Sequence, residues 1–155
     1  MKRRYLTLLS ITLLLTVLMT SSCSKEIAGC TDPDSINYDA TANVDDGSCQ
    51  YQGQLVIWFE KNTSDFFLAD GTTSLKFFLD GVLATTMPVT NYFALQPNCG
   101  DVNTATLTKN LGKEKAKNVT ITIKAQDDFV YGSYELIAIA NYCVSHRLVK
   151  EKKRK

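Results

Sequence analysis

The stretch VTITIKA, residues 119–125, decides the fold class of this 155-residue chain. Apolar residues occupy its odd positions, Val119, Ile121, Ile123 and Ala125, while threonine or lysine occupies the even ones. Successive side chains of a β-strand point to opposite faces, so this alternation places one face against a core and the other in solvent. The stretch therefore predicts a half-buried β-strand.

Other strand-like segments lie on both sides of it. They are residues 55–59, 75–80, 82–86, 102–108, 134–142 and 144–149. Asp80-Gly81, between two of them, is a strong hairpin signal because this dipeptide accepts the positive φ angles of a tight turn. Six or seven short strands without a convincing amphipathic helix predict an all-β fold, an antiparallel β-sandwich over residues 52–149.

A small acidic module, residues 30–51, precedes the predicted sandwich. It contains five acids and no basic residue: Asp32, Asp34, Asp39, Asp45 and Asp46. So short a segment with so few apolar residues cannot build its own core and needs a covalent staple. A bond between Cys30 and Cys49 would close it, so we expect a disulfide-closed loop module.

The N-terminus has the pattern of an export signal. Positive residues at 2–4 are followed by an apolar stretch at 5–20, which is shorter than the roughly 20 residues that span a bilayer comfortably. The stretch ends in Ser-Ser-Cys23, which resembles the lipobox of bacterial lipoproteins. The resemblance implies removal of residues 1–22, lipidation of Cys23 and a tether over residues 23–29.

The lipobox resemblance departs from the family pattern at Thr20, where leucine is usual. An ordinary secretory signal cut near Ser22 is the alternative, with Cys23 left as a free thiol. In the lipoprotein family, Asp after the cysteine retains many members at the inner membrane, and this chain has Ser24-Lys25 instead. The resemblance therefore implies an outer-membrane location in the cell envelope.

The five cysteines fit an exported protein. An odd number leaves one thiol to explain, and lipid on Cys23 would account for it. The remaining Cys30, Cys49, Cys99 and Cys143 allow three pairings. Their two groups along the chain make Cys30–Cys49 with Cys99–Cys143 the simplest pairing, and disulfides persist in the oxidising compartments that exported proteins enter.

Two further segments resemble known families. Residues 29–49 resemble a cysteine-bounded repeat of secreted and surface proteins of Gram-negative bacteria, with the pattern GCTDP…NYD…DDGSC; Ser35 stands where alanine is usual. Residues 53–148 resemble small β-sandwich domains of bacterial surface lipoproteins, on the strand 53–59 and the segment 97–100, Pro-Asn-Cys-Gly. The first resemblance implies an extracellular location, and neither resemblance implies a defined activity.

The charge distribution excludes a general nucleic-acid binder. From Cys23 to Val149 the chain has 9 basic and 15 acidic residues, which is a net charge of −6. A surface that tracks a nucleic-acid backbone needs clustered lysine and arginine on the folded part. The basic tail, residues 150–155, is expected to be a solvated end, with contact to anionic lipid head groups or polysaccharide as the alternative.

Candidates for catalysis and for a zinc site are weak. His146 is the only histidine, and no recognisable motif supplies a nucleophile or carboxylate partner for it. Asp127 and Asp128 are adjacent in a polar segment and are expected to form a turn. A zinc site of Cys99, Cys143 and His146 would use a ligand-like Cys-x-x-His spacing but lacks a fourth good ligand. We therefore expect a protein that is not an enzyme.

Five aromatic residues could line a sugar-binding face: Trp58, Tyr92, Phe93, Phe129 and Tyr131. Aromatic rings stack on the flat faces of pyranose rings. Aromatic residues at alternating strand positions belong more commonly to a core, so carbohydrate binding is the alternative here.

The acidic module suggests weak calcium binding. Oxygen-bearing side chains recur at every second position, Asp39, Thr41, Asn43 and Asp45, ahead of Asp46-Gly47. Ca²⁺ collects six to eight oxygen ligands, and extracellular modules bind it with dissociation constants of roughly 10⁻⁴–10⁻³ M. The alternative is that these side chains cap turns through Asx hydrogen bonds. No other cofactor is expected.

The sequence thus predicts a non-catalytic cell-envelope lipoprotein that acts as a binding or structural module. Its expected partners are the membrane, through the lipid, and an envelope protein or polysaccharide. The alternative is a carbohydrate-binding or polysaccharide-degrading accessory protein, and a cleft with two carboxylates about 5–10 Å apart would favour degradation.

Overall fold

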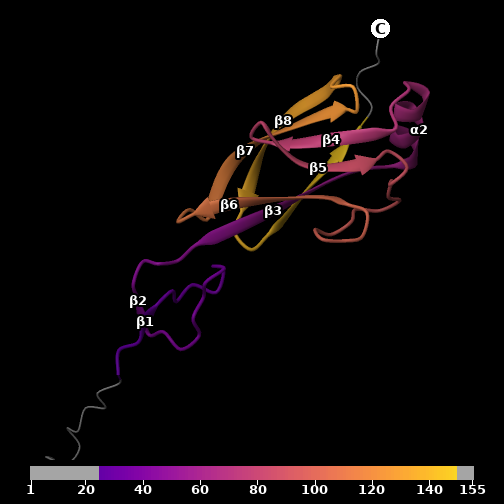
Figure 1. Cartoon of the computed structure of the whole chain (residues 1–155). Coiled ribbons are helices and arrows are strands. Elements are labelled where there is room, and N and C mark those ends of the chain that lie inside the picture. The colour runs from indigo at the N-terminus through magenta and orange to yellow at the C-terminus, as the bar shows by residue number, and fades with distance from the viewer. Residues whose placement is uncertain (1–24, 150–155) are drawn as a thin grey trace, which may run out of the picture.

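The computed structural model describes residues 25–149 (Figure 1). Two short strands, β1 (Ala28–Gly29) and β2 (Val44–Asp45), pair in the N-terminal module. Seven longer strands and one helix form the body of the described chain. The predicted all-β sandwich of six or seven strands, preceded by a disulfide-closed loop, is confirmed with seven strands.

The seven strands form two sheets, one with the order β6-β3-β9 and one with the order β5-β4-β7-β8. Their bounds are β3 (Tyr51–Phe59), β4 (Ser74–Leu79), β5 (Val82–Pro88), β6 (Ala105–Gly112), β7 (Ala116–Ala125), β8 (Val130–Ile139) and β9 (Cys143–Leu148). Asp80 and Gly81 have φ angles of 50° and 82° and connect β4 to β5 as the predicted two-residue hairpin.

The core lies between the two sheets and follows the alternation seen in the sequence. Val119, Ile121 and Ile123 of β7 are at most 1% exposed. Leu75 and Phe77 of the neighbouring β4 are fully buried. These side chains join one apolar cluster with residues of the other sheet, so burial of alternate residues from both sheets holds the sandwich together.

Strand β3 is buried on both faces. Leu55, Ile57 and Phe59 belong to the core, and Val56 and Trp58 on the opposite face are also buried. The loop of residues 89–104 bonds to the end of this strand, where its Phe93 N–H donates to Phe59 O. A continuous apolar run is the expected pattern for a strand covered on both sides.

The expectation of a purely antiparallel sandwich needs one correction. β3 pairs antiparallel with β6 but parallel with β9. The reason is the short connection before β9: Ala140, just after β8, bridges to Gly53 near the start of β3. Strand β9 therefore starts beside the N-terminal end of β3 and runs in the same direction as β3.

Gly53 permits this close approach of the two sheets. A Cβ atom at this position would lie 2.8 Å from Ile139 O and 2.9 Å from Ile139 N. Both contacts are with backbone, which cannot move aside as a flexible side chain would. The position therefore requires glycine.

Helix α2 (Lys61–Ala69) is an element that the sequence did not predict. It connects β3 to β4 and covers one end of the sandwich (Figure 1). The ring of Phe67 lies 5.5 Å from that of Phe59 and 4.7 Å from that of Tyr131. Tertiary packing of one phenylalanine stabilises the helix. Neither the length of the segment nor its amphipathicity predicts a helix from the sequence.

Two strand boundaries also differ from the sequence-based expectation. The segment 102–108 was expected as a strand, but β6 begins at Ala105 because Asn103, with a φ of 66°, forms a turn. The segment 134–142 was expected as one run, but β8 ends at Ile139 because Asn141 has a φ of 52°. A residue in the left-handed region cannot continue an extended strand.

Candidate functional site

The N-terminal module is held together by one disulfide and by turn hydrogen bonds. Cys30 and Cys49 are bonded, with their Cα atoms 4.9 Å apart. Asp39 Oδ1 accepts hydrogen bonds from the Thr41 N–H and hydroxyl at 2.8 and 2.7 Å. Asp45 Oδ1 accepts the N–H of the residue two positions on, at 3.0 Å. The module therefore has a defined conformation with little apolar interior.

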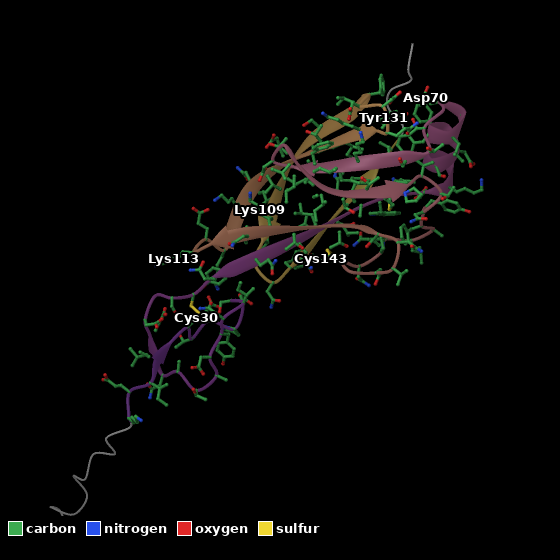
Figure 2. All side chains as sticks on the ribbon, viewed as in Figure 1. Cys30, Asp70, Lys109, Lys113, Tyr131 and Cys143 are labelled. Carbon is green, nitrogen blue, oxygen red and sulfur yellow. A yellow bond between two sulfur atoms is a disulfide. The ribbon has the colours of Figure 1, made fainter. Side chains whose placement is uncertain are left out.

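Lys115 connects this module to the sandwich. It lies on the connection between β6 and β7, the hairpin on which Figure 2 labels Lys113. Its Nζ is 2.6 Å from Asp32 Oδ2 and 3.3 Å from Asp34 Oδ2. The Tyr51 hydroxyl, at the first residue of β3, donates to the same Asp32 oxygen at 2.7 Å, so Lys115 and Tyr51 bind one carboxylate.

These contacts change the pKa values of the three groups. Hydrogen bonds lower the pKa of Asp32 from 3.8 to about 2, with Lys115 as the largest cause, followed by Tyr51 and a backbone N–H. The Asp32 hydrogen bond raises the pKa of Lys115 and also that of Tyr51. The Asp32–Lys115 pair therefore stays charged across the neutral pH range.

A groove of about 480 Å³ lies at the junction of the module and the sandwich. The module contributes residues 34–36 to its lining, and strand β3 contributes Gln52 and Gln54. Residues 98–99 of the long loop, residues 141–142 before β9 and Cys143, the first residue of β9, form the rest. Ligand clefts commonly have volumes of about 300–1,000 Å³, so the groove is large enough for a small ligand or a short segment of a polymer.

The groove presents four side-chain amides to solvent. In the described part of the chain, the amides of Gln52, Gln54, Asn98 and Asn141 have no hydrogen-bond partner. Each amide offers two N–H donors and one carbonyl acceptor. The arrangement can therefore satisfy ligand groups that both donate and accept.

Two exposed apolar side chains lie beside the amides. Tyr142 is 62% exposed and Ile36 is 63% exposed, and both line the groove. Tyr142 comes from the turn before β9, while Ile36 comes from the module. The groove thus combines uncharged polar groups with an aromatic ring and an aliphatic side chain, contributed by separate parts of the chain.

The second disulfide positions one wall of the groove. Cys99 of the long loop is bonded to Cys143, the first residue of β9, with the Cα atoms 5.7 Å apart. Figure 2 labels Cys143 on the sandwich and Cys30 in the module. The predicted pairing of all four cysteines is confirmed, and the alternative zinc site with His146 is wrong because both of its sulfur atoms are in this bond.

The residues predicted for calcium already accept hydrogen bonds. Asp46 Oδ1 accepts the N–H of Ser48, two residues on, at 2.9 Å, whereas Asn43 Oδ1 accepts the N–H of Ile27, 16 residues away, at 2.9 Å. Within residues 25–149, no three His, Cys, Asp or Glu side chains are grouped to hold a metal. The geometry fits the Asx-turn alternative, and calcium binding by Asp39, Asn43, Asp45 and Asp46 stays a prediction that calorimetry with Ca²⁺ can test.

The five aromatic residues considered for sugar binding do not form one face. Trp58 is buried and donates from Nε1 to Ser145 Oγ at 2.9 Å. Phe129 stacks edge-on with Tyr131, which packs against helix α2 at the end of the sandwich away from the module (Figure 2). The turn that carries Asp127 and Asp128 precedes them, and Asp128 has a φ of 66°, typical of a turn former.

A smaller cavity of about 220 Å³ lies near the C-terminal end of β9. Its charged groups already bind each other: Arg147 Nη1 is 2.6 Å from Glu60 Oε1. Arg147 also lies 6.0 Å from the ring of Trp58. Since this cavity is smaller and its charges are paired, the groove at the junction is the stronger candidate.

The anchoring predictions lie outside the described residues. Cys23, the signal segment 1–22 and the tail 150–155 all fall there. Among residues 25–149, no helix is long and apolar enough to cross a membrane.

The chain matches no family model, no curated protein and no solved structure. The site is therefore argued from its own residues. Sequence reasoning missed the amides of β3 and of the two loops, as well as Tyr142 and Lys115. No motif links these positions, although Tyr142 is a large aromatic residue directly before a disulfide cysteine, which is a signal of an ordered surface position.

Proposed function

We propose that this chain is a non-catalytic binding protein of the cell envelope, anchored by lipid on Cys23, and that the junction groove binds its partner. The observation that carries the proposal is the groove itself, which is built from the module, β3, the long loop and the turn before β9. The partner would be an envelope protein or a polysaccharide.

The assembly of the groove supports a binding role. The Cys99–Cys143 bond holds the loop side, and the pair between Lys115 and Asp32 holds the module side. Preorganised walls reduce the entropy that binding costs, because fewer side chains and loops must be ordered when a ligand enters. A surface built in this way suits recognition.

The chemistry of the lining supports a role without catalysis. Among the described residues that line the groove, Asp34 is the one carboxylate. Its Oδ2 is 3.3 Å from Lys115 Nζ. Glycoside hydrolases use two carboxyl groups on either side of the scissile bond. The groove therefore favours binding of a polysaccharide over its degradation.

Photo-crosslinking on intact cells tests the proposal with the full-length protein. A benzophenone amino acid in place of Tyr142 should give crosslinked adducts, because this side chain lies in the groove. The matched control is the same replacement at Tyr38, which is also exposed but lies in the module outside the groove lining. Adducts from position 142 that are absent at position 38 support the proposal, and equal yields at both positions or none at either contradict it.

A further inference from the structure

The geometry points to a neutral oligosaccharide as the ligand of the junction groove, with Tyr142 as the stacking platform and the amides of Gln52, Gln54, Asn98 and Asn141 as the hydroxyl-binding groups. This inference rests on the proposed function, since it names the class of ligand for the same groove. The site is distinct from the sugar-binding face suggested by the sequence, which consists of the aromatic residues 58, 92, 93, 129 and 131.

The amides match sugar hydroxyl groups. A hydroxyl both donates and accepts hydrogen bonds, and so does a side-chain amide. The amides of Gln54 and Asn98 have no partner in the described chain and are exposed, so a ligand would replace water without breaking a protein hydrogen bond. Neighbouring ring hydroxyls present donors and acceptors at short intervals, which suits a row of amides contributed by different elements.

Tyr142 supplies the apolar part of the recognition. Its side chain is 62% exposed, and a pyranose ring has an apolar face of C–H groups that stacks on an aromatic ring. Ile36, which also lines the groove, adds a second apolar contact from the module side. A ligand that is polar at its edges and apolar on its flat faces satisfies both parts of this lining.

The charges favour an uncharged sugar. Lys115 compensates the one carboxylate of the lining, Asp34, and no cationic side chain is among the described residues that line the groove. An acidic sugar would find no cation in the groove and would approach a body with 15 acidic and 9 basic residues from Cys23 to Val149. Like charges of this kind reduce both the rate of association and the affinity.

The groove is less suited to an extended peptide. Peptides that add to a sheet bind through main-chain hydrogen bonds along an open strand edge. Strand β3, which lines the groove, is the central strand of its sheet and pairs with β6 and β9 on its two sides. Of the edge strand β9, only the first residue, Cys143, lines the groove, so a peptide would find little open strand edge there. A protein partner is the competing outcome of the test.

Calorimetry with full-length protein in detergent micelles tests the inference. The probes are short oligosaccharides of glucose, mannose and xylose, with galacturonic acid oligomers and an uncharged hexapeptide as comparisons. We expect binding of at least one neutral oligosaccharide. Tyr142→Ala should weaken that binding about tenfold, whereas Tyr142→Phe should retain it, because the ring face and not the hydroxyl makes the contact. Gln54→Glu should also weaken it, because a carboxylate has lost the N–H donors.

The matched control is Tyr92→Ala, which removes another exposed tyrosine outside the groove and should leave affinity unchanged. Unchanged thermal unfolding of the variants at 142 shows that they fold. The inference is overturned if the intact protein binds no neutral oligosaccharide, if it prefers the acidic sugar or the peptide, or if Tyr142→Ala leaves binding intact. Crosslinks from position 142 to a protein, without sugar binding, would overturn this inference and leave the proposed binding function standing.

Discussion

At the scale of single residues, Asp32 joins the module to the sandwich. One of its oxygens accepts hydrogen bonds from Lys115 and Tyr51, and its other oxygen accepts the N–H of Asp34 at 3.0 Å. The cation of Lys115 also lies 5.6 Å from the centre of the Tyr51 ring. A single carboxylate thus joins two parts of the chain that lie far apart in sequence.

We expect the Asp32 contact to make stability depend on pH in the acid range. The pKa of Asp32 is lowered from 3.8 to about 2, so the unfolded chain takes up a proton before the folded protein does. The stabilisation is therefore complete above about pH 4 and is lost as the pH falls toward about 2. The midpoint of thermal unfolding, followed by circular dichroism, should drop over this window.

Two variants separate this contact from the other carboxyl groups of the chain. Asp32→Asn should unfold at a lower temperature than wild type near neutral pH, and the difference should shrink as the pH approaches about 2. Lys115→Met should reduce the pH dependence of the unfolding midpoint over the same pH window. The double variant should unfold at nearly the same temperature as either single variant, because both substitutions remove the same interaction. A constant difference between wild type and Asp32→Asn at every pH contradicts the assignment.

At the scale of elements, helix α2 and the loop of residues 89–104 add contacts that the strands do not make with one another. Phe67 of the helix packs on Phe59 of β3 and on Tyr131 of β8, and Ser64 donates to Val89 O at 2.6 Å. The helix closes one end of the sandwich, and the loop bonds to the end of β3 through Phe93. Both elements depend on tertiary contacts more than on their local sequence.

Phe67→Ala should destabilise the protein by about 3–5 kcal/mol, because it removes a buried ring and leaves a cavity between the helix and both sheets. The measurement is the free energy of unfolding in urea. Leu68→Ala, at the next residue of the same helix, is the control, since Leu68 is 45% exposed and its loss should change stability by about 0.5 kcal/mol or less. Similar losses from both variants would contradict the assignment of this stabilisation to the buried ring of Phe67.

The Cys99–Cys143 bond should stabilise the fold and hold the long loop against β9. Replacing both cysteines with serine should cost about 2–4 kcal/mol, because the bond closes a chain segment of 44 residues. We expect the loop to shield Trp58, the only tryptophan, so loosening the loop should also shift the fluorescence to longer wavelength. Replacing Cys30 and Cys49 in the same way should leave this emission unchanged, and an unchanged emission in both variants would count against the covering role of the loop.

At the scale of the whole molecule, the groove depends on the module and the sandwich meeting. Neither part alone contains both Ile36 and Tyr142, and Figure 1 shows the module beyond the end of the sandwich where β3 begins. The lipid proposed at Cys23 would be separated from the module by a tether of a few residues. The binding surface would then lie close to the membrane.

Cys23→Ser should release the protein from the membrane fraction or block its processing, because the lipid would supply the whole membrane affinity. Fractionation of cells followed by detection of the intact chain is the measurement. Ser24→Ala, next to the cysteine, is the matched control and should leave partitioning unchanged. Membrane partitioning of Cys23→Ser equal to that of the wild type would remove the lipoprotein proposal.

The amino-acid sequence by itself determined the fold class and the hairpin at Asp80-Gly81, and it made one of three cysteine pairings the simplest. The first two follow from local chemistry, which is alternation along a strand and positive φ at a turn. The stretch 119–125 becomes the buried face of β7 for that reason. The sequence also indicated how the N-terminal module closes, because Cys30 and Cys49 flank its acidic residues.

Only the tertiary structure decided the parallel pairing of β9, helix α2 and the groove. The direction of β9 depends on the contact at Gly53, where two segments more than eighty residues apart meet, and no local pattern encodes such a contact. The groove brings together Ile36, Gln54, Asn98 and Tyr142 from four separate segments. Exposed amides and one tyrosine have no periodicity or spacing of their own, because their function comes from proximity in space, which folding alone creates.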